Sequence, residues 1–259
     1  MDTCSPDICS KSSLTSFSHG ANIAVVGAGG GIGKALIDCL ALDDNRPNII
    51  ALNRGDVRRS GWKGLFKSLE LENESSIKEA SEFIRCKMGN LSAVIVATGL
   101  LHDDTGIKPE KSWNSLDPYS IERVYRVNTV GPALVAKYFL PLLDDNCKSV
   151  FACLSARVGS ISDNVLGGWY AYRASKAALN MILKNLSIEL RRKNKNAICV
   201  GLHPGTVSTK LSKPFSNNVL PETIVSPEQA AINLLSLLND FTVSDSGKIF
   251  AYDGSIIPY

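Results

Sequence analysis

Tyr172 and Lys176 are the pair of side chains with the clearest capacity for chemistry in this sequence. They stand four residues apart, so a helix would place the phenol and the ammonium on one face. A phenol is a poor acid–base group at neutral pH because its reference pKa is about 10. A neighbouring ammonium stabilises the phenolate and lowers the phenol pKa, which suits the pair to general acid–base catalysis. The spacing is also common on helix surfaces, so other residues must support this interpretation.

A hydroxyl group stands upstream of this pair, at Ser155. It follows the apolar run Val150–Leu154, which has the pattern of a strand buried on both faces. In doubly wound α/β folds, ligands bind at the carboxyl ends of the parallel strands. Ser155 is therefore a candidate hydrogen-bond donor to a substrate in the same site as Tyr172 and Lys176.

A glycine-rich segment at residues 27–33 reads Gly-Ala-Gly-Gly-Gly-Ile-Gly and lies between an apolar run and a helical segment. Glycines allow a tight turn and let a pyrophosphate approach the backbone, and the next helix presents free N–H groups to phosphate. We expect a dinucleotide here rather than a merely flexible turn, with contacts from Gly27, Gly29, Gly31, Ile32 and Gly33. No Gly-Lys-Ser/Thr follows, so the segment is not a P-loop.

The end of the next apolar run bears on the choice of dinucleotide. A carboxylate at that place would hold the ribose 2′-OH of NAD, whereas a cation suits the 2′-phosphate of NADP. The sequence places Asn53 and Arg54 there, with no acidic residue until Asp56. Arg54 can bind a phosphate through two hydrogen bonds, so NADP(H) is favoured over NAD(H). The alternative is that Arg54 is a solvated loop residue.

Short apolar runs alternate with amphipathic segments along most of the chain. The expected strands are Asn22–Val26, Asn48–Leu52, Ala93–Ala97, Val150–Leu154 and Ala197–Leu202, with shorter candidates at Ser68–Leu71 and Ile249–Tyr252. The expected helices are Lys34–Leu42, Ser75–Cys86, Ser120–Leu143, Tyr172–Lys193 and Ser226–Leu238. This alternation predicts an α/β fold, a single doubly wound parallel sheet with helices on both faces.

The fold is expected to span residues 21–259 as one domain. Residues 1–20 are rich in serine and have no apolar periodicity, which predicts a disordered tail, with an organelle address as the alternative. The 259 residues contain no apolar run of the ~18 residues that a membrane span needs.

Composition excludes several function classes. A net charge of +3 with no block of basic residues gives no indication of nucleic-acid binding. Seven cysteines without a C-x-x-C pair, and three scattered histidines, do not predict a disulfide framework or a metal site. Cysteines inside apolar stretches are typical of a reducing compartment, so we expect the cytoplasm, with an organelle as the alternative.

Asn128 lies inside an expected helix that its own sequence interrupts. Pro132, four residues later, has no N–H to donate to the Asn128 carbonyl. That carbonyl is then available to a water molecule, and Gly131-Pro132 should bend the helix. The alternative is an asparagine merely tolerated at the bend.

Together, these motifs resemble the short-chain dehydrogenase/reductase family, whose members bind NAD(P)(H) in a Rossmann fold. The resemblance covers residues 21–259 and rests on the loop glycines 27, 31 and 33, on Asn128, Ser155, Tyr172 and Lys176, and on Pro-Gly-Thr-Val-Ser-Thr at 204–209. Several details look like the C-factor and sniffer-type carbonyl reductases, namely Val-Gly-Ser-Ile at 158–161, Gly-Gly-Trp-Tyr-Ala-Tyr-Arg at 167–173, Leu-His-Pro-Gly at 202–205 and Tyr-Asp-Gly at 252–254.

The resemblance implies a role for each catalytic candidate. Tyr172 would give a proton to a carbonyl oxygen, and Ser155 would orient that oxygen. Lys176 would bind the nicotinamide ribose and lower the tyrosine pKa, and Asn128 would hold a relay water. Further cofactor contacts would come from Gly99 on the adenosine side, from Pro204, Gly205, Val207 and Thr209 at the carboxamide, and from Asn128, Tyr172 and Lys176 themselves.

The sequence also departs from the family pattern. The usual Asn-Asn-Ala-Gly after the fourth strand is Val-Ala-Thr-Gly at 96–99, and the acid after the third strand is either Glu70 or Glu72. The usual glycine stands three residues after the serine, but Gly159 stands four after Ser155, so counting back reaches Ala156. Counting along the strand instead selects Ser155, because side-chain alternation fixes strand register. Ser160 is the substitute candidate.

The function that these residues favour is NADP(H)-dependent transfer of a hydride between nicotinamide and a small carbonyl or alcohol substrate. The alternative is a dinucleotide-binding signalling protein with little turnover. Residues 210–225 are long and polar and should cover the site as a lid. The apolar stripe of residues 179, 182, 183, 186 and 190 indicates either a homo-oligomer contact or the face that covers the sheet.

Overall fold

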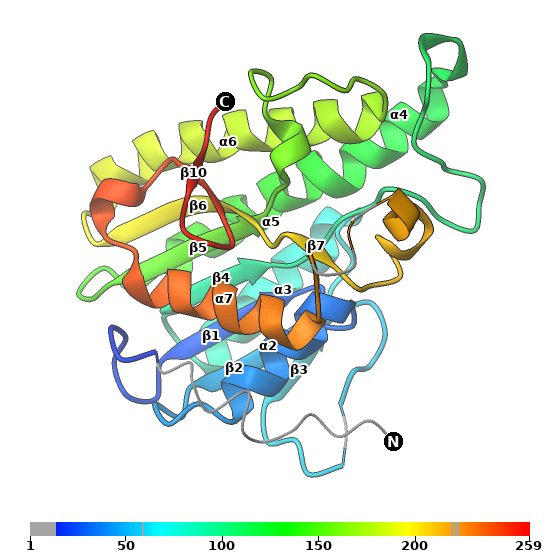
Figure 1. Ribbon diagram of the computed structural model, residues 1–259. Coiled ribbons are helices and arrows are strands. Elements are labelled where there is room, and N and C mark those ends of the chain that lie inside the picture. The colour runs from blue at the N-terminus through cyan, green and yellow to red at the C-terminus, as the bar shows by residue number, and fades with distance from the viewer. Residues whose placement is uncertain (1–13, 59, 219, 221–222) are drawn as a thin grey trace.

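A single eight-stranded sheet runs through the computed structural model, which describes residues 14–58, 60–218, 220 and 223–259 (Figure 1). The strand order is β10-β9-β6-β5-β4-β1-β2-β3, and every pairing is parallel except that of β10 with β9. The bounds are β1 Asn22–Val26, β2 Asn48–Asn53, β3 Leu65–Ser68, β4 Ala93–Val96, β5 Ser149–Leu154, β6 Ala197–His203, β9 Ile249–Ala251 and β10 Ile256–Ile257. The doubly wound parallel sheet expected from the sequence is confirmed.

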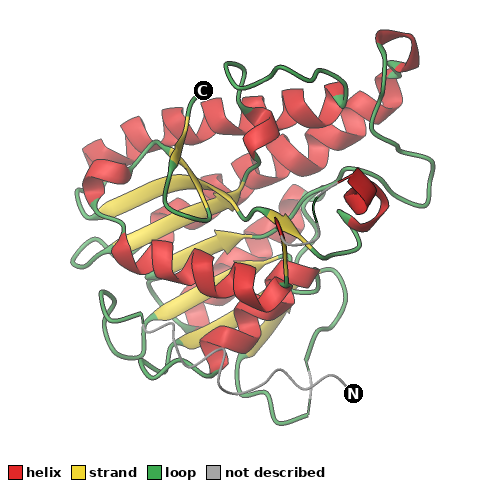
Figure 2. Ribbon diagram, in the orientation of Figure 1, coloured by secondary structure: helices red, strands yellow, loops and turns green. Residues whose placement is uncertain are grey.

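Helices cover both faces of this sheet (Figure 2). Two of them, α2 (Gly31–Ala41) and α7 (Pro227–Asp240), form one apolar layer with the sheet. Three others, α3 (Glu74–Lys87), α5 (Gly131–Phe139) and α6 (Tyr170–Lys193), form the second layer.

The strand side chains divide between these layers by alternation. In β1, Ile23 and Val25 belong to the layer of α2 and α7, whereas Ala24 and Val26 belong to the other. Because both faces are buried, the central strands must be apolar along their whole length. This requirement explains why five of the strands were readable from the sequence as continuous apolar runs.

The third strand differs from the sequence expectation. The sequence predicts a strand at Ser68–Leu71, but β3 spans Leu65–Ser68. This strand lies at the sheet edge, and its side chains are half-buried or exposed, so it lacks the continuous apolar run of the central strands. An edge strand has one neighbour and weaker burial, and its bounds are correspondingly hard to read.

The long helix expected at Ser120–Leu143 is divided. It consists of α4 (Pro118–Tyr125), a π-helical turn over Arg126–Val130 and α5, followed by a 3₁₀ turn at Leu140–Leu142. The wider π turn precedes Pro132, whose ring prevents an ordinary α-helical hydrogen bond to residue 128. The sequence predicted a bend at Gly131-Pro132, and the structure has a π turn directly before these two residues.

The folded core includes residues before position 21, where the domain was expected to begin. Leu14 and Phe17 are buried in the layer of α2 and α7, and the Asn45 amide donates to the carbonyls of Leu14 and Phe17. The expectation of a disordered tail through residue 20 is therefore wrong for residues 14–20. The rest of that expectation, residues 1–13, lies outside the described residues.

The apolar stripe of α6 faces the sheet for the most part. Leu179, Leu183 and Leu190 are buried in the core, as expected if the stripe covers the sheet. A homo-oligomer stays a prediction. None of the helices in the described part of the chain is long and apolar enough to cross a membrane.

The turn after β5 packs closely on α6, which makes a prediction about stability. A Cβ on Gly159 would lie 2.7 Å from the Lys176 Cβ and 3.0 Å from the Lys176 carbonyl carbon. We expect Gly159→Ala to lower the free energy of unfolding by about 1–3 kcal/mol, because the turn must move away from the helix backbone. Urea denaturation measures this change.

Gly55→Ala is the matched control, because a Cβ on Gly55 would meet no atom within 4 Å. It should change the free energy of unfolding by no more than about 0.5 kcal/mol. Equal stability of both variants and the wild type would contradict the close contact between turn and helix.

Candidate active site

The carboxyl ends of four neighbouring strands bring the candidate residues to one edge of the sheet. Gly27 follows β1, Gly99 lies three residues after β4, Ser155 follows β5 and Pro204 follows β6. These strands are parallel, so their ends open on the same side (Figure 1). Ligand sites of doubly wound folds occupy this position.

The glycine loop is closely packed at the start of α2. A Cβ on Gly33 would lie 2.1 Å from the Gly27 carbonyl oxygen, so only glycine fits there. On the other side of the loop, a Cβ on Gly31 would lie 2.7 Å from Thr209 Cγ2. The helix has Gly30 as its N-cap and no side-chain cap, which leaves first-turn N–H groups available to an anion.

A cleft of about 480 Å³ extends from this loop across the carboxyl ends of β1, β2, β3 and β4. It is lined by Gly27, Gly30, Asn53, Arg54, Glu70, Glu72, Gly99 and Arg123, among others. The two candidate acids after β3 therefore both reach it. They differ in their partners, because the Glu72 carboxylate accepts a hydrogen bond from Arg123.

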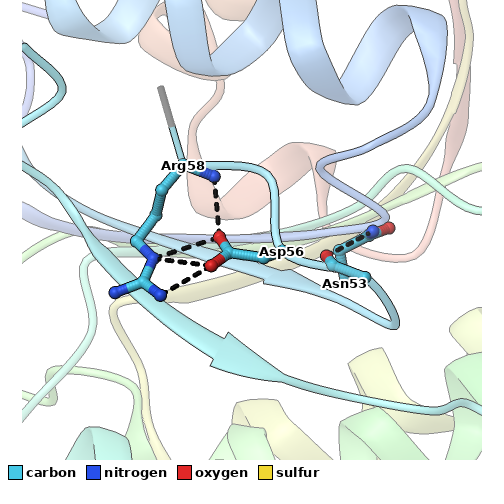
Figure 3. Close-up of polar contacts among 4 residues, drawn as sticks. Asn53, Asp56 and Arg58 are labelled. Carbon is cyan, nitrogen blue, oxygen red and sulfur yellow. Dashed lines mark hydrogen bonds and ion pairs between the residues drawn. The ribbon is translucent and has the colours of Figure 1, made fainter. Parts of the chain in front are cut away.

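The loop after β2 holds its polar side chains in defined positions (Figure 3). The Asn53 side chain accepts from the Gly29 N–H at 3.3 Å and donates to the Gly55 carbonyl at 2.9 Å. The Asp56 carboxylate accepts from Arg58 Nη2 at 2.6 Å and from its Nε at 3.0 Å. Of the described arginines of this loop, Arg58 is engaged by Asp56 and Arg54 lines the cleft.

Tyr172 and Lys176 lie one turn apart on α6, as the sequence predicted. The Lys176 Nζ is 5.8 Å from the centroid of the Tyr172 ring. Loss of water on burial raises the pKa of the Tyr172 phenol to about 12. The sequence predicted a lowered phenol pKa beside the ammonium, and this prediction is wrong for the net shift, because the effect of burial is larger. The phenol keeps its proton at neutral pH.

The Lys176 ammonium is buried, with the residue 2% exposed. Its Nζ donates to the Leu154 carbonyl at 2.7 Å, and burial lowers the pKa of the ammonium to about 8. A Cβ on Gly99 would lie 3.8 Å from this Nζ and 3.9 Å from Asn128 Oδ1. Lys176, Asn128 and the backbone at Gly99 therefore meet at one point.

Asn128 connects two segments of the site. Its side chain exchanges two hydrogen bonds with Leu100, from the Leu100 N–H at 2.7 Å and to the Leu100 carbonyl at 2.9 Å. Its Nδ2 also donates to Ser175 Oγ at 3.1 Å, and Ser175 Oγ donates to the Tyr172 carbonyl at 2.7 Å. The loop after β4 is thus fixed to the helix that carries Tyr172.

A buried carboxylate begins α6. Glu110, 4% exposed, accepts from the Ala171 N–H at 3.2 Å. A negative charge at this place is favoured by the positive end of the helix dipole. The preceding Trp169 has φ +49°, a strained value for a bulky residue, and its N–H donates to the Glu110 carbonyl. These contacts fix the start of α6, whose first turn contains Tyr172.

Aromatic rings connect Tyr172 to the segment expected to form a lid. The Trp169 ring packs edge-on against Tyr172, with centroids 6.2 Å apart, and against Phe215 at 5.2 Å. Phe215 in turn packs against His102 at 5.5 Å, and His102 Nε2 lies 3.2 Å from the Lys210 and Leu211 carbonyl oxygens. Phe215, in the segment expected to form a lid, therefore lies against Trp169, which in turn contacts Tyr172.

Ser155 is buried at the end of β5 and its hydroxyl is already engaged. Ser155 Oγ donates to Asn180 Oδ1 at 2.6 Å. The substitute candidate, Ser160, is also buried, but its Oγ accepts from the Asp163 N–H at 3.2 Å and lies beyond the 3₁₀ turn. Ser155 therefore contacts α6 at Asn180, which lies one helical turn after Lys176.

The segment after β6 completes the edge. Val207 is buried in β7 (Thr206–Val207), which pairs with β8 (Ile224–Val225) in a separate two-stranded ladder. Gly205 has φ +81°, and a Cβ there would lie 3.0 Å from the Tyr252 ring. The position of Thr209 against Gly31 connects this segment to the glycine loop.

Sequence reasoning missed four residues that support the site, namely Glu110, Trp169, Ser175 and Asn180. Ser175 and Asn180 stand three and eight residues after Tyr172, so helical spacing alone could have placed Asn180 on the Tyr172–Lys176 face. Glu110 carries no local signal, because its partner lies 61 residues away.

The family assignment comes from comparison with known proteins. Residues 21–219 match the family model described as short chain dehydrogenase. A 1-hydroxy-2-glutathionyl-2-methyl-3-butene dehydrogenase from Rhodococcus sp. (strain AD45) is 30% identical over 92% of this chain and 100% of that protein. The C-signal of Myxococcus xanthus is 32% identical over 56% of this chain and 81% of that protein.

Solved structures agree in fold. The NADPH-bound carbonyl reductase from chicken fatty liver has a TM-score of 0.82 and 25% identity, covering 94% of this chain and 96% of that one. The carbonyl reductase Sniffer of D. melanogaster has a TM-score of 0.81 and 22% identity, covering 93% and 100%. With its Rossmann-like sheet and its match along most of its length, this chain belongs to the short-chain dehydrogenase/reductase family of NAD(P)-dependent oxidoreductases.

Proposed function

We propose that this protein is an NADP(H)-dependent oxidoreductase that interconverts a small-molecule carbonyl and its alcohol, with Tyr172 as the proton donor. The observation that carries the proposal is geometric: the Tyr172 phenol lies one helical turn from the buried Lys176 ammonium, at the strand edge that also holds the glycine loop. The NADPH-bound chicken carbonyl reductase supports both the cofactor and the substrate class.

The chain's own residues fit a dinucleotide. The glycines of the loop, which packs closely at Gly33, let a pyrophosphate come close to the loop backbone. The start of α2 has no side-chain cap and offers N–H groups to the pyrophosphate. Arg54 would hold the 2′-phosphate, with Asn53 fixing the loop beside it. Gly99 would border the adenosine side, and residues 204–209 would hold the carboxamide. The bound cofactor would supply the hydride.

Residues of α6 would deliver the proton to the substrate. Tyr172 holds its proton at neutral pH, and this protonated form is the one that carbonyl reduction consumes. The Lys176 ammonium, anchored on Leu154, would bind the ribose and stabilise the phenolate that forms. Ser155 would orient the substrate oxygen, and Asn128 would hold the water that returns a proton.

A second candidate function is dinucleotide binding in signalling, with little turnover. The similarity to C-signal over about half of the chain is the observation that favours it. A binding protein has no need of a proton donor, so the Tyr172–Lys176 pair favours the reductase. Oxidation of NADPH with a panel of aldehydes, ketones and quinones separates the two.

The proton donor gives the most direct test. Tyr172→Phe should lower turnover at least 100-fold and leave the Kd for NADPH nearly unchanged, because it removes one proton and little else. Tyr170→Phe is the matched control, since that tyrosine lies on the same helix with 36% of its surface exposed. Retention of more than about a tenth of the wild-type rate by Tyr172→Phe would remove the tyrosine from its role.

The substrate-orienting hydroxyl can be identified by a pair of variants. Ser155→Ala should reduce kcat/KM by a factor equivalent to roughly 2–3 kcal/mol, the loss of one hydrogen bond to the developing oxyanion. Ser160→Ala should leave kcat/KM close to the wild-type value. Both are measured with one substrate under the same conditions, and loss of activity in the Ser160 variant alone would reverse the assignment.

Cofactor preference should depend on Arg54. Arg54→Ala should weaken NADPH binding by about 1.5–3 kcal/mol and change NADH binding little, because only NADPH has the 2′-phosphate. Fluorescence titration of the two cofactors measures both affinities, and NADH serves as the internal control. Equal weakening of the two would exclude Arg54 as the selecting residue.

A further inference from the structure

Ser155 and Asn180 form a buried hydrogen-bonded pair behind the catalytic residues. The two residues are 4% and 3% exposed, and the Ser155 Oγ donates to Asn180 Oδ1 at 2.6 Å. Asn180 follows Lys176 by one helical turn and Tyr172 by two, so the three side chains lie in one row along α6. None of the roles assigned above uses Asn180.

The other end of the Asn180 amide is the informative feature. Its Nδ2 is buried and has no hydrogen-bond partner among the described residues. An unpaired buried N–H group destabilises the folded protein and requires an explanation. The two ends of an amide have nearly the same shape, so a rotation of 180° would present Nδ2 to Ser155 without steric change.

The direction of this hydrogen bond decides what Ser155 can do. A serine hydroxyl has one proton and two lone pairs. While Ser155 donates that proton to Asn180, it can accept a hydrogen bond from an alcohol but cannot donate one to a carbonyl. After rotation of the amide, Asn180 Nδ2 donates to Ser155 Oγ, and the serine proton becomes available to a carbonyl oxygen.

We propose that Asn180 is a positioning residue that controls the Ser155 hydroxyl through this rotation, an inference that rests on the proposed function. In the observed orientation the pair makes one hydrogen bond. With a carbonyl bound, the rotated orientation makes two, from Asn180 to Ser155 and from Ser155 to the substrate. The substrate itself therefore favours the rotated amide, and the pair serves the alcohol in one orientation and the carbonyl in the other.

A double-mutant cycle tests the coupling. Asn180→Ala should lower kcat/KM about ten-fold when Ser155 is present and less than three-fold in the Ser155→Ala background, with the Kd for NADPH unchanged. Asn185→Ala, on an exposed position of the same helix, is the control and should have no effect in either background. Equal effects of Asn180→Ala in both backgrounds would overturn the proposal.

Two further measurements keep the test decisive. If thermal unfolding shows that Asn180→Ala is not folded, Asn180→Ser replaces it, because a serine there is too short to reach Ser155. The rotation itself is tested by the ¹⁵N side-chain amide signal of Asn180, which should shift when a ketone is added to the protein with NADP⁺ and should not shift in Ser155→Ala. An unchanged signal in the wild type would overturn the rotation.

The proposed function and the role of Asn180 can be contradicted independently of each other. A wild-type protein that reduces no carbonyl in the panel would contradict the proposed function. A wild-type protein that is active, with additive effects at positions 155 and 180, would contradict only the role of Asn180.

Discussion

The buried ammonium of Lys176 is the constraint on which the arrangement of the site depends. A charge removed from water is tolerated only where it has a close polar partner, and here that partner is the Leu154 carbonyl at the end of β5. α6 must therefore lie against the carboxyl end of this strand. Tyr172, one turn earlier, and Asn180, one turn later, then come to the same strand end.

The π turn between α4 and α5 positions Asn128, which joins two other segments of the site. Because Pro132 removes an α-helical hydrogen bond, the chain forms a π turn, and Asn128 lies buried in that turn. From there its amide reaches both the backbone at Leu100 and Ser175 on α6. A local defect in one helix thus joins the loop after β4 to the helix that carries the tyrosine.

Unfavourable features collect at this edge of the sheet. Trp169 has a strained left-handed backbone, and a buried carboxylate, Glu110, lies beside it. Of the four buried side-chain polar atoms without a partner in the described part of the chain, three belong to Thr98 after β4, Asn180 beside the end of β5, and His203 at the end of β6. Strain and unpaired polar groups typically concentrate where a protein binds and reacts.

The sequence alone determined the sheet, the glycine loop and the Tyr172–Lys176 pair, because these depend on local periodicity and on spacing within one element. Only the tertiary structure decided what lies far apart in the chain. The partner of Ser155 is 25 residues away and the partner of the α6 N-terminus is 61 residues away, and neither pairing can be inferred from local spacing. The rise in the Tyr172 pKa likewise follows from burial, which spacing does not encode. The edge strand β3 and the early entry of Leu14 into the core were misplaced for the same reason, since their packing partners lie in distant segments.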